Sequence, residues 1–149
     1  EVQLPFIKYL FPKTEIVPIV IGKDWKTSAN LIISTIKKTN KKVCIIMSTD
    51  FTHYGKMYNY ILFNSNIKQN IKSLDNKAID YIKNLDSNGF IQDCDKNDKT
   101  ICGKYAVACG LEILNELEVN KVRIINYSTS ADITKDTNNS VSYCSIIFE

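Results

Sequence analysis

The sequence predicts an α/β domain in which a layered sheet carries helices on both faces. Short apolar runs alternate along the chain with longer segments whose apolar residues recur every three or four positions. The run at 42–48, KVCIIMS, is apolar at consecutive positions, as in a strand that is covered on both sides. The chain has 149 residues and is 44% hydrophobic, which is sufficient for the core of one globular domain.

The first 50 residues predict a strand, a helix and a second strand. The segment 15–22, EIVPIVIG, is typical of a strand, and Pro18 places it at an edge or at another position without ladder hydrogen bonds. Asp24 is suited to cap a helix over about 25–39. The apolar stripe of this helix has spacings of three and four and consists of Trp25, Ala29, Ile32, Ile33 and Ile36. The run 42–48 is the second strand.

The middle of the chain predicts helices. Residues 66–85 carry apolar side chains at helical spacing, and Asp75 is a candidate cap that would divide this segment into two helices. The sequence DSNG at 86–89 ends the segment. Residues 105–118 predict a largely buried helix with a polar edge.

The last third predicts two strands, at 121–127 and 140–148, joined by a polar loop that is ordered around Asp132. In layered α/β sheets, ligands bind beyond the strand ends. His53, Cys102 and this loop all lie near the ends of predicted elements, so they are the places to look for a site.

Composition and charge argue against several functions. The net charge is +3 and Arg123 is the only arginine, whereas proteins that recognise nucleic acids specifically depend on arginine, so we expect no nucleic-acid binding. No apolar run approaches the roughly 18 residues of a membrane span. The five cysteines are odd in number and form no C-x-x-C pair, which favours a reduced, cytoplasmic compartment.

His53 is the only histidine, and it has two interpretations. It follows Asp50 by three residues, just past the apolar run 42–48. In the simpler interpretation it is a surface or hydrogen-bonded loop residue. In the functional one, the Asp50 carboxylate fixes the tautomer of the imidazole and raises its basicity, for acid–base catalysis or metal binding.

Cys102 is the second candidate, because it precedes the predicted helix at 105–118. A helix N-terminus and the neighbouring Lys104 favour a thiolate, although a cysteine that only packs is equally consistent with this position. Together with His53 it would form a thiol–imidazole dyad. A catalytic metal usually needs about three protein ligands. A complete metal site from this chain would therefore need His53, Cys102 and the carboxylate of Asp50 or Asp132.

Five motifs, taken in order, resemble the Memo family. They are EVQLPF at 1–6, VPIVIG at 17–22, STDFTHYG at 48–55, TICGK at 100–104 and YSTSADITKDTNNSVSYCSI at 127–146. On these motifs the sequence is identified as a member of the Memo-like family, also called AmmeMemoRadiSam system protein B. The resemblance extends from the first residue to the last.

The resemblance implies a fold and a domain organisation. The fold is expected to be a three-layer αβα sandwich with a mixed sheet, similar to the class III extradiol dioxygenases. In the family, EVQLP usually follows directly on EHSL, so residues 1–149 are expected to be the C-terminal portion of the Memo-like domain. The absent N-terminal half would carry two more pocket histidines. Half of a sheet exposes unpaired strand edges, so we expect poor solubility for this portion alone.

The resemblance also implies a metal-type pocket. STDFTHYG places Asp50 and His53 on the family's aspartate and histidine, as catalytic residues. TICGK places Cys102 on the family's cysteine, which with His53 would bind iron or copper, completed by ligands outside this chain. The residues expected to bind the substrate are Asp132, Ser142 and Tyr143.

Two functions are implied for this pocket. The first is redox chemistry like that of the dioxygenases, using non-haem iron or copper and a small aromatic substrate, although a thiolate departs from the two-histidine, one-carboxylate set of such enzymes. The second is an adaptor that binds phosphotyrosine peptides, or a non-catalytic interaction protein that uses the same pocket. Phosphotyrosine sites normally contain several arginines, so the single arginine weighs against the adaptor. The sequence predicts no particular oligomeric state.

Overall fold

The computed structural model describes residues 2–149 and has helices and strands that alternate along this part of the chain. Its helices are α1 (Leu4–Leu10), α2 (Trp25–Lys38), α3 (Ile67–Lys83), α4 (Ser87–Lys96), α5 (Lys104–Glu116) and α6 (Ala131–Thr134). Its strands are β1 (His53–Gly55), β2 (Val122–Thr129) and β3 (Asn139–Phe148), and a short 3-10 helix, η1 (Lys56–Tyr58), follows β1. The protein is therefore mixed α/β, as predicted.

The sheet has three strands in the order β1-β3-β2, and both pairings are antiparallel. His53 pairs with Val141, and Tyr127 pairs with Cys144. A bulge between Ile124 and Asn126 shifts the register of β2. The strand pairs among the described residues are thus antiparallel, not mixed as expected.

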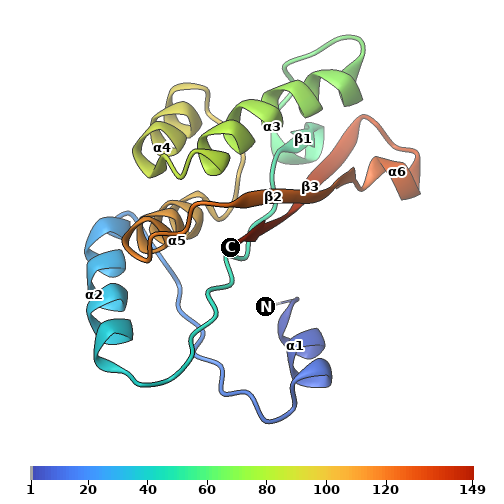
Figure 1. The fold of residues 1–149 in the computed structure, drawn as a ribbon. Coiled ribbons are helices and arrows are strands. Elements are labelled where there is room, and N and C mark those ends of the chain that lie inside the picture. Colours follow the sequence, from blue (N-terminus) through green and yellow to red (C-terminus); the bar gives the residue numbers. More distant parts are fainter. Residues whose placement is uncertain (1) are drawn as a thin grey trace.

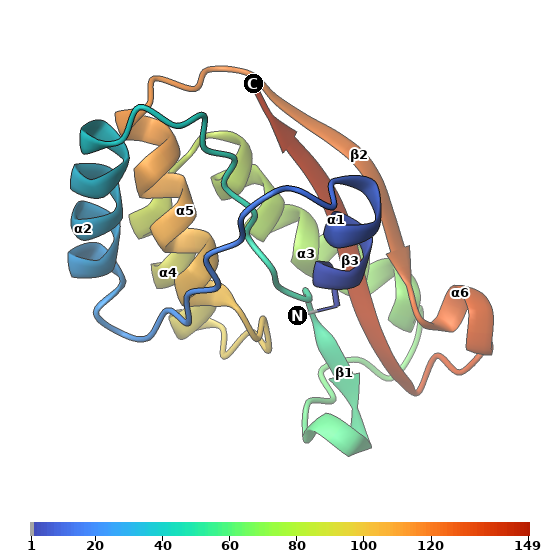
Figure 2. The ribbon, with the colours of Figure 1, turned by 90° about the horizontal axis from the view of Figure 1, so that it is seen from below.

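Helices cover the two faces of this sheet unequally (Figures 1 and 2). Helix α3 lies across one face, while the other carries, of the elements described, only the short helix α1 and stretches of extended chain. Helices α2, α4 and α5 pack side by side next to the sheet, with α5 against both α2 and α4. The part of the chain that is described therefore does not form the expected sandwich with two full helical layers, and similarity to extradiol dioxygenases stays a prediction.

The main core lies among α2, α3, α4 and α5. Trp25 and Ala29, predicted on the stripe of α2, are both buried. Asp24 precedes α2 as expected, but its side chain makes no capping hydrogen bond, whereas Asp86 caps α4 by accepting one from the amide of Gly89. A smaller cluster holds Tyr54, Tyr60 and Ile71 under the loop that follows β1.

Two predicted strands do not form. Residues 15–22 and 42–48 have no regular secondary structure, and within the described chain they make no hydrogen bonds between backbone groups. The apolar pattern was recognised correctly, but a strand also needs a neighbour that pairs with its N–H and C=O groups. Neither segment has such a neighbour among residues 2–149.

The predicted break in α3 is also wrong. Helix α3 runs without interruption from Ile67 to Lys83, and Asp75 lies near its middle. The Asp75 side chain is 0% exposed and accepts hydrogen bonds from other elements, so it has no capping role.

No helix in the described part of the chain combines the length and the apolar character that a membrane crossing needs.

Candidate metal site

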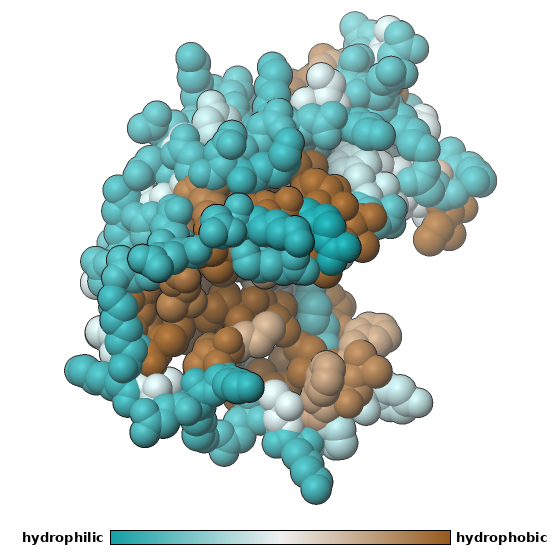
Figure 3. All heavy atoms as spheres, viewed as in Figure 1, coloured by the Kyte–Doolittle hydropathy of each residue, from teal (hydrophilic) through white to brown (hydrophobic). Residues whose placement is uncertain are grey.

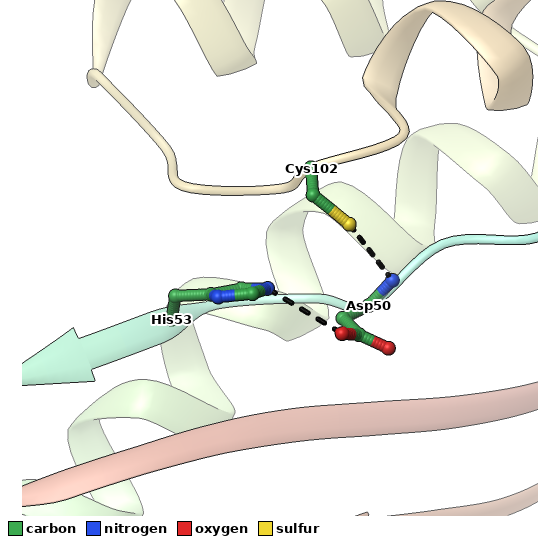
Figure 4. Close-up of side chains that lie close together, drawn as sticks. All are labelled: Asp50, His53 and Cys102. Carbon is green, nitrogen blue, oxygen red and sulfur yellow. Dashed lines mark hydrogen bonds and ion pairs between the residues drawn. The ribbon is translucent and has the colours of Figure 1, made fainter. Parts of the chain in front are cut away.

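Three candidate residues from separate segments lie together in the structure (Figure 4). One nitrogen of His53, one carboxylate oxygen of Asp50 and the sulfur of Cys102 all lie within 4.8 Å of one another. His53 Nε2 is 3.6 Å from Asp50 Oδ2, and the backbone N–H of Asp50 donates to Cys102 Sγ at 3.4 Å. Imidazole, carboxylate and thiol donors therefore converge on one point.

The His53 imidazole is the most informative group in this cluster. Its Nε2 atom is buried and has no hydrogen-bond partner among the described residues. The 3.6 Å that separates it from the Asp50 carboxylate is too long for a hydrogen bond. Buried polar atoms are nearly always satisfied, so an orphaned nitrogen that points at two other donor atoms calls for a ligand between them. A metal ion fits this requirement.

The hydroxyls of two threonines hold the cluster together by hydrogen bonds to backbone groups. The backbone N–H of His53 donates to Thr100 Oγ1 at 2.9 Å, and the same hydroxyl donates to the His53 carbonyl at 2.8 Å. Thr49 Oγ1 accepts from the Gly103 amide at 2.9 Å and lies 3.8 Å from Cys102 Sγ. The segment that carries Cys102 is thus tied on both sides to the segment that carries Asp50 and His53.

Cys102 lies two residues before α5 and is exposed, as is expected of a thiol that can reach a ligand. Lys104, which the sequence placed beside it as a positive charge, donates instead to Asp95 Oδ1 at 2.6 Å. That hydrogen bond to a carboxylate raises the pKa of Lys104. The thiol therefore has the helix start and the Asp50 amide as its electropositive neighbours.

The buried carboxylate of Asp75 anchors the segment that leads into His53. Asp75 of α3 accepts from the backbone and hydroxyl of Thr52, from the Tyr127 hydroxyl at 2.7 Å and from the Ser142 hydroxyl at 2.5 Å. Burial, followed by the nearby Asp75 carboxylate, raises the pKa of Tyr127 well above its usual range. Asp75 therefore joins α3, β2 and β3 to Thr52, which lies next to His53.

Sequence analysis missed this role of Asp75, although a signal was present. Ile71, Ala78, Ile79 and Ile82 form the buried stripe of α3, and Asp75 follows Ile71 by four residues on that same stripe. A carboxylate in the middle of an apolar stripe must find donors, because leaving it buried and unpaired is costly. Thr49 and Thr100 were also missed, and nothing in their spacing marks them.

The predicted substrate-binding residues lie in different surroundings. Tyr143 is 41% exposed, and burial together with the Asp50 carboxylate and Tyr58 raises its pKa, so its phenol lies near the cluster. Ser142 is 1% exposed, and its hydroxyl donates to Asp75. Asp132 is in α6 and is not one of the three clustered donors. Their roles toward a substrate stay predictions.

The ring of Tyr58 completes the surroundings of His53. It meets the imidazole edge to face, with ring centroids 5.0 Å apart and planes 87° apart. One aromatic side chain, that of Tyr58, is therefore in contact with the imidazole of the cluster.

Asp132 is expected to stay charged to unusually low pH. Its ion pair with Lys68, and the hydrogen bond that it accepts from the Thr129 amide at 2.7 Å, lower its pKa to about 2. Because the folded pKa is below that of the unfolded chain, these contacts stabilise the fold at pH values above about 4 and are lost as the pH falls toward 2. Carboxyl NMR titration checks this. A normal Asp132 midpoint near 4 would contradict it.

These features define a class: a mixed α/β protein with a candidate metal site of imidazole, carboxylate and thiol. A comparison of the sequence with family models matches the family described as "Memo-like protein" over residues 1–147. The chain therefore belongs to the Memo-like family.

Individual relatives agree with this assignment. The chain is 31% identical to a MEMO1 family protein of Pyrococcus abyssi, in an alignment that covers 99% of the chain and 54% of that protein. It is 33% identical to MEMO1 family proteins of Thermoplasma volcanium and Thermococcus onnurineus, again over 99% of the chain, covering 51% and 55% of them. The chain thus spans about half the length of the curated relatives that it matches.

Proposed function

We propose that this Memo-like chain binds a redox-active transition metal, iron or copper, at Asp50, His53 and Cys102. The observation that carries the proposal is the buried Nε2 of His53, which has no hydrogen-bond partner in the described chain and faces two other potential ligand atoms. From the family motifs, His53 and Cys102 were inferred as metal ligands and Asp50 as a catalytic residue beside them.

The donor set suits this class of metal. Imidazole binds iron, copper and zinc, and a thiolate favours soft or borderline ions over magnesium or calcium. Three ligands are the number that catalytic metal sites commonly take from the protein. The remaining positions would be filled by water, by a substrate or by residues outside this chain, as the family resemblance implies.

The proposed activity is dioxygenase-like oxidation of a small aromatic molecule. Iron or copper would supply the redox chemistry with dioxygen. His53 would act as a ligand rather than as an acid–base group, because a nitrogen that binds a metal cannot also take up a proton. The Asp50 side chain is 42% exposed and can both bind and exchange protons with a substrate phenol. Tyr58 and Tyr143 would contact the aromatic ring.

The phosphotyrosine-adaptor hypothesis gains no support from the site. Arg123, the only arginine, belongs to β2 and pairs there with Glu149. Arg123 pairs across the sheet with Ile147, near one end of β3. The other end of β3 pairs with β1 and lies beside the cluster, and Ile147 is five residues beyond Ser142. This chain therefore places no arginine near His53 that could bind a phosphate group with its guanidinium fork.

Cobalt and iron titrations test the metal proposal. Under anaerobic conditions Co(II) is expected to give the near-ultraviolet charge-transfer absorption of a thiolate ligand, and Fe(II) to bind in competition with it. Cys102→Ser is expected to abolish the absorption band. We expect His53→Ala to weaken the binding of both ions at least about tenfold, as the loss of one of three ligands implies.

Cys44→Ser is the matched control, because Cys44 is the other exposed cysteine and lies outside the cluster. The three remaining thiols are less accessible than Cys102, since Cys94 and Cys109 are buried and Cys144 is half-buried. Burial raises the pKa of Cys94 to about 12 and that of Cys144 to about 11, and it also raises that of Cys109. If Cys102→Ser and His53→Ala bind Fe(II) as tightly as the unmodified chain, the proposed site is wrong.

A further inference from the structure

Two residues of the charged types are buried in the described part of the chain, Asp75 and Lys99. Asp75 is satisfied by the hydroxyl groups that donate to it. The Lys99 side chain is 0% exposed, although a lysine is almost never fully buried unless it is paired. Figure 3 shows where charged side chains ordinarily lie, since hydrophilic residues cover the outer side of α3 and α4 in the upper part of the view. The inward position of Lys99 is therefore explained by its partners.

The Lys99 ammonium group binds one group on each of two helices. It forms an ion pair with the carboxylate of Asp93 in α4, whose side chain is 11% exposed. It also donates a hydrogen bond to the backbone carbonyl of Leu74 in α3 at 3.0 Å. Lys99 thus ties its own segment of the chain to α3 and to α4 at the same time.

The segment that Lys99 ties down is the loop that also carries Cys102. This loop, residues 97–103, joins α4 to α5, and Figure 4 shows its cysteine facing the segment of the other two donors. Asp93 holds the loop at two points. One carboxylate oxygen pairs with Lys99, and the other accepts a hydrogen bond from the Asn97 side-chain amide at 2.9 Å. The first half of the loop is therefore fixed before the chain reaches Cys102.

Consecutive residues of α3 anchor both segments of the metal site. The carbonyl of Leu74 accepts from Lys99, which lies three residues before Cys102. The next residue of the helix, Asp75, accepts from the backbone and hydroxyl of Thr52, in the segment that leads into the imidazole. Because neighbouring residues of a helix have a fixed spacing, these two attachments set the position of one segment relative to the other.

We propose that Lys99 is a positioning residue of the metal site, which holds the Cys102 sulfur beside Asp50 and His53. The inference rests on the proposed function, because it concerns the same three donor atoms. An apolar pair of similar volume often stabilises a fold as well as a buried ion pair does, so stability alone does not account for Lys99. Without its charge the loop can shift on α3 and α4, and the 3.4 Å hydrogen bond from the Asp50 amide to the Cys102 sulfur is lost. Lys99 acts through the loop and not by contact with the metal.

Lys99→Met tests the proposal in the whole protein, because methionine is similarly long and unbranched but has neither charge nor N–H groups. We expect this variant to weaken Co(II) binding about tenfold or more and to diminish the thiolate absorption band, as the loss of groups that orient metal ligands usually does. Lys37→Met is the matched control, since it removes an exposed ion pair with Glu116 and should change neither property. Asp93→Asn removes the charge of the partner while keeping its shape. It should weaken Co(II) binding in the same direction, and it serves if Lys99→Met does not fold.

Hydrogen exchange followed by NMR tests the same role without a metal. The backbone amides of Asp50, His53 and Gly103 make the hydrogen bonds that join the two segments of the site. In Lys99→Met these three amides are expected to exchange about tenfold faster relative to the interior amides of α3, because the loop opens locally. Leu114→Ala is the control for stability, since it creates a cavity at a buried side chain near the far end of α5. It should speed all of these amides by a common factor.

The outcomes separate this inference from the proposed function. If the unmodified protein binds no Co(II), the proposed function fails; selectively faster exchange of the three amides in Lys99→Met would still support the role of Lys99, and its absence would overturn it. If the unmodified protein binds Co(II), and Lys99→Met binds it equally tightly with unchanged exchange, the inference is overturned while the metal site stands. The inference is also overturned if Leu114→Ala, at an equal loss of stability, weakens Co(II) binding and speeds the three amides as selectively as Lys99→Met does.

Discussion

Replacing Asp75 with alanine is expected to lower the free energy of unfolding by about 3–5 kcal/mol. The Asp75 carboxylate is fully buried and accepts hydrogen bonds from Thr52, Tyr127 and Ser142. Its removal leaves these donors buried without an acceptor and opens a cavity in the middle of the sheet–helix contact. Leaving several buried donors unsatisfied costs more free energy than losing any single exposed ion pair of the chain.

Urea unfolding followed by circular dichroism measures this effect. Asp80→Ala is the matched control, since Asp80 is on the same helix and makes only an exposed ion pair with Lys83. It should change stability by less than about 1 kcal/mol. Asp75→Asn keeps one acceptor oxygen and should fall between the two. Equal losses for Asp75→Ala and Asp80→Ala would show that the buried hydrogen bonds contribute little.

Three of the helices show what a sequence pattern is able to predict: α2, α3 and α5 were expected, whereas α1, α4 and α6 were not. Helix α2 begins at Trp25, where it was expected, and ends one residue before the expected position, while α5 begins at Lys104. The hydrogen bonds of a helix are made within one segment, so its apolar spacing carries nearly all the information that is needed. The strands β2 and β3 were also predicted, and each has the other as a neighbour.

The segments 15–22 and 42–48 show the limit of predicting structure from a sequence pattern. Their composition is that of strands, but strand pairing depends on residues that are distant in the sequence, and none among the described residues pairs with them. The same limit applies to the site. Asp50 and His53 are neighbours in the sequence, whereas the approach of Cys102 depends on contacts of Thr49 and Thr100 that no spacing reveals.

Gly103→Ala is expected to have the second large effect, because the segments that carry Asp50 and Cys102 meet at this glycine. A Cβ atom added to Gly103 would lie 2.7 Å from Thr49 Cβ and 2.8 Å from the Ser48 carbonyl oxygen. The backbone of Gly103 has a φ of −99°, which alanine adopts without strain, so any loss comes from this crowding alone. Overpacking of this kind costs about 1–3 kcal/mol.

Metal binding is expected to weaken together with stability in Gly103→Ala. The added methyl group pushes the Ser48–Thr49 backbone outward, which removes the Gly103–Thr49 hydrogen bond and moves the Asp50 amide away from the Cys102 sulfur. Gly22→Ala is the matched control, since nothing lies within 4 Å of a Cβ added there. Urea unfolding and Co(II) titration of both variants separate the two effects. If Gly103→Ala lost stability but bound Co(II) with unchanged affinity and absorption, the three donor atoms would not depend on this contact for their alignment.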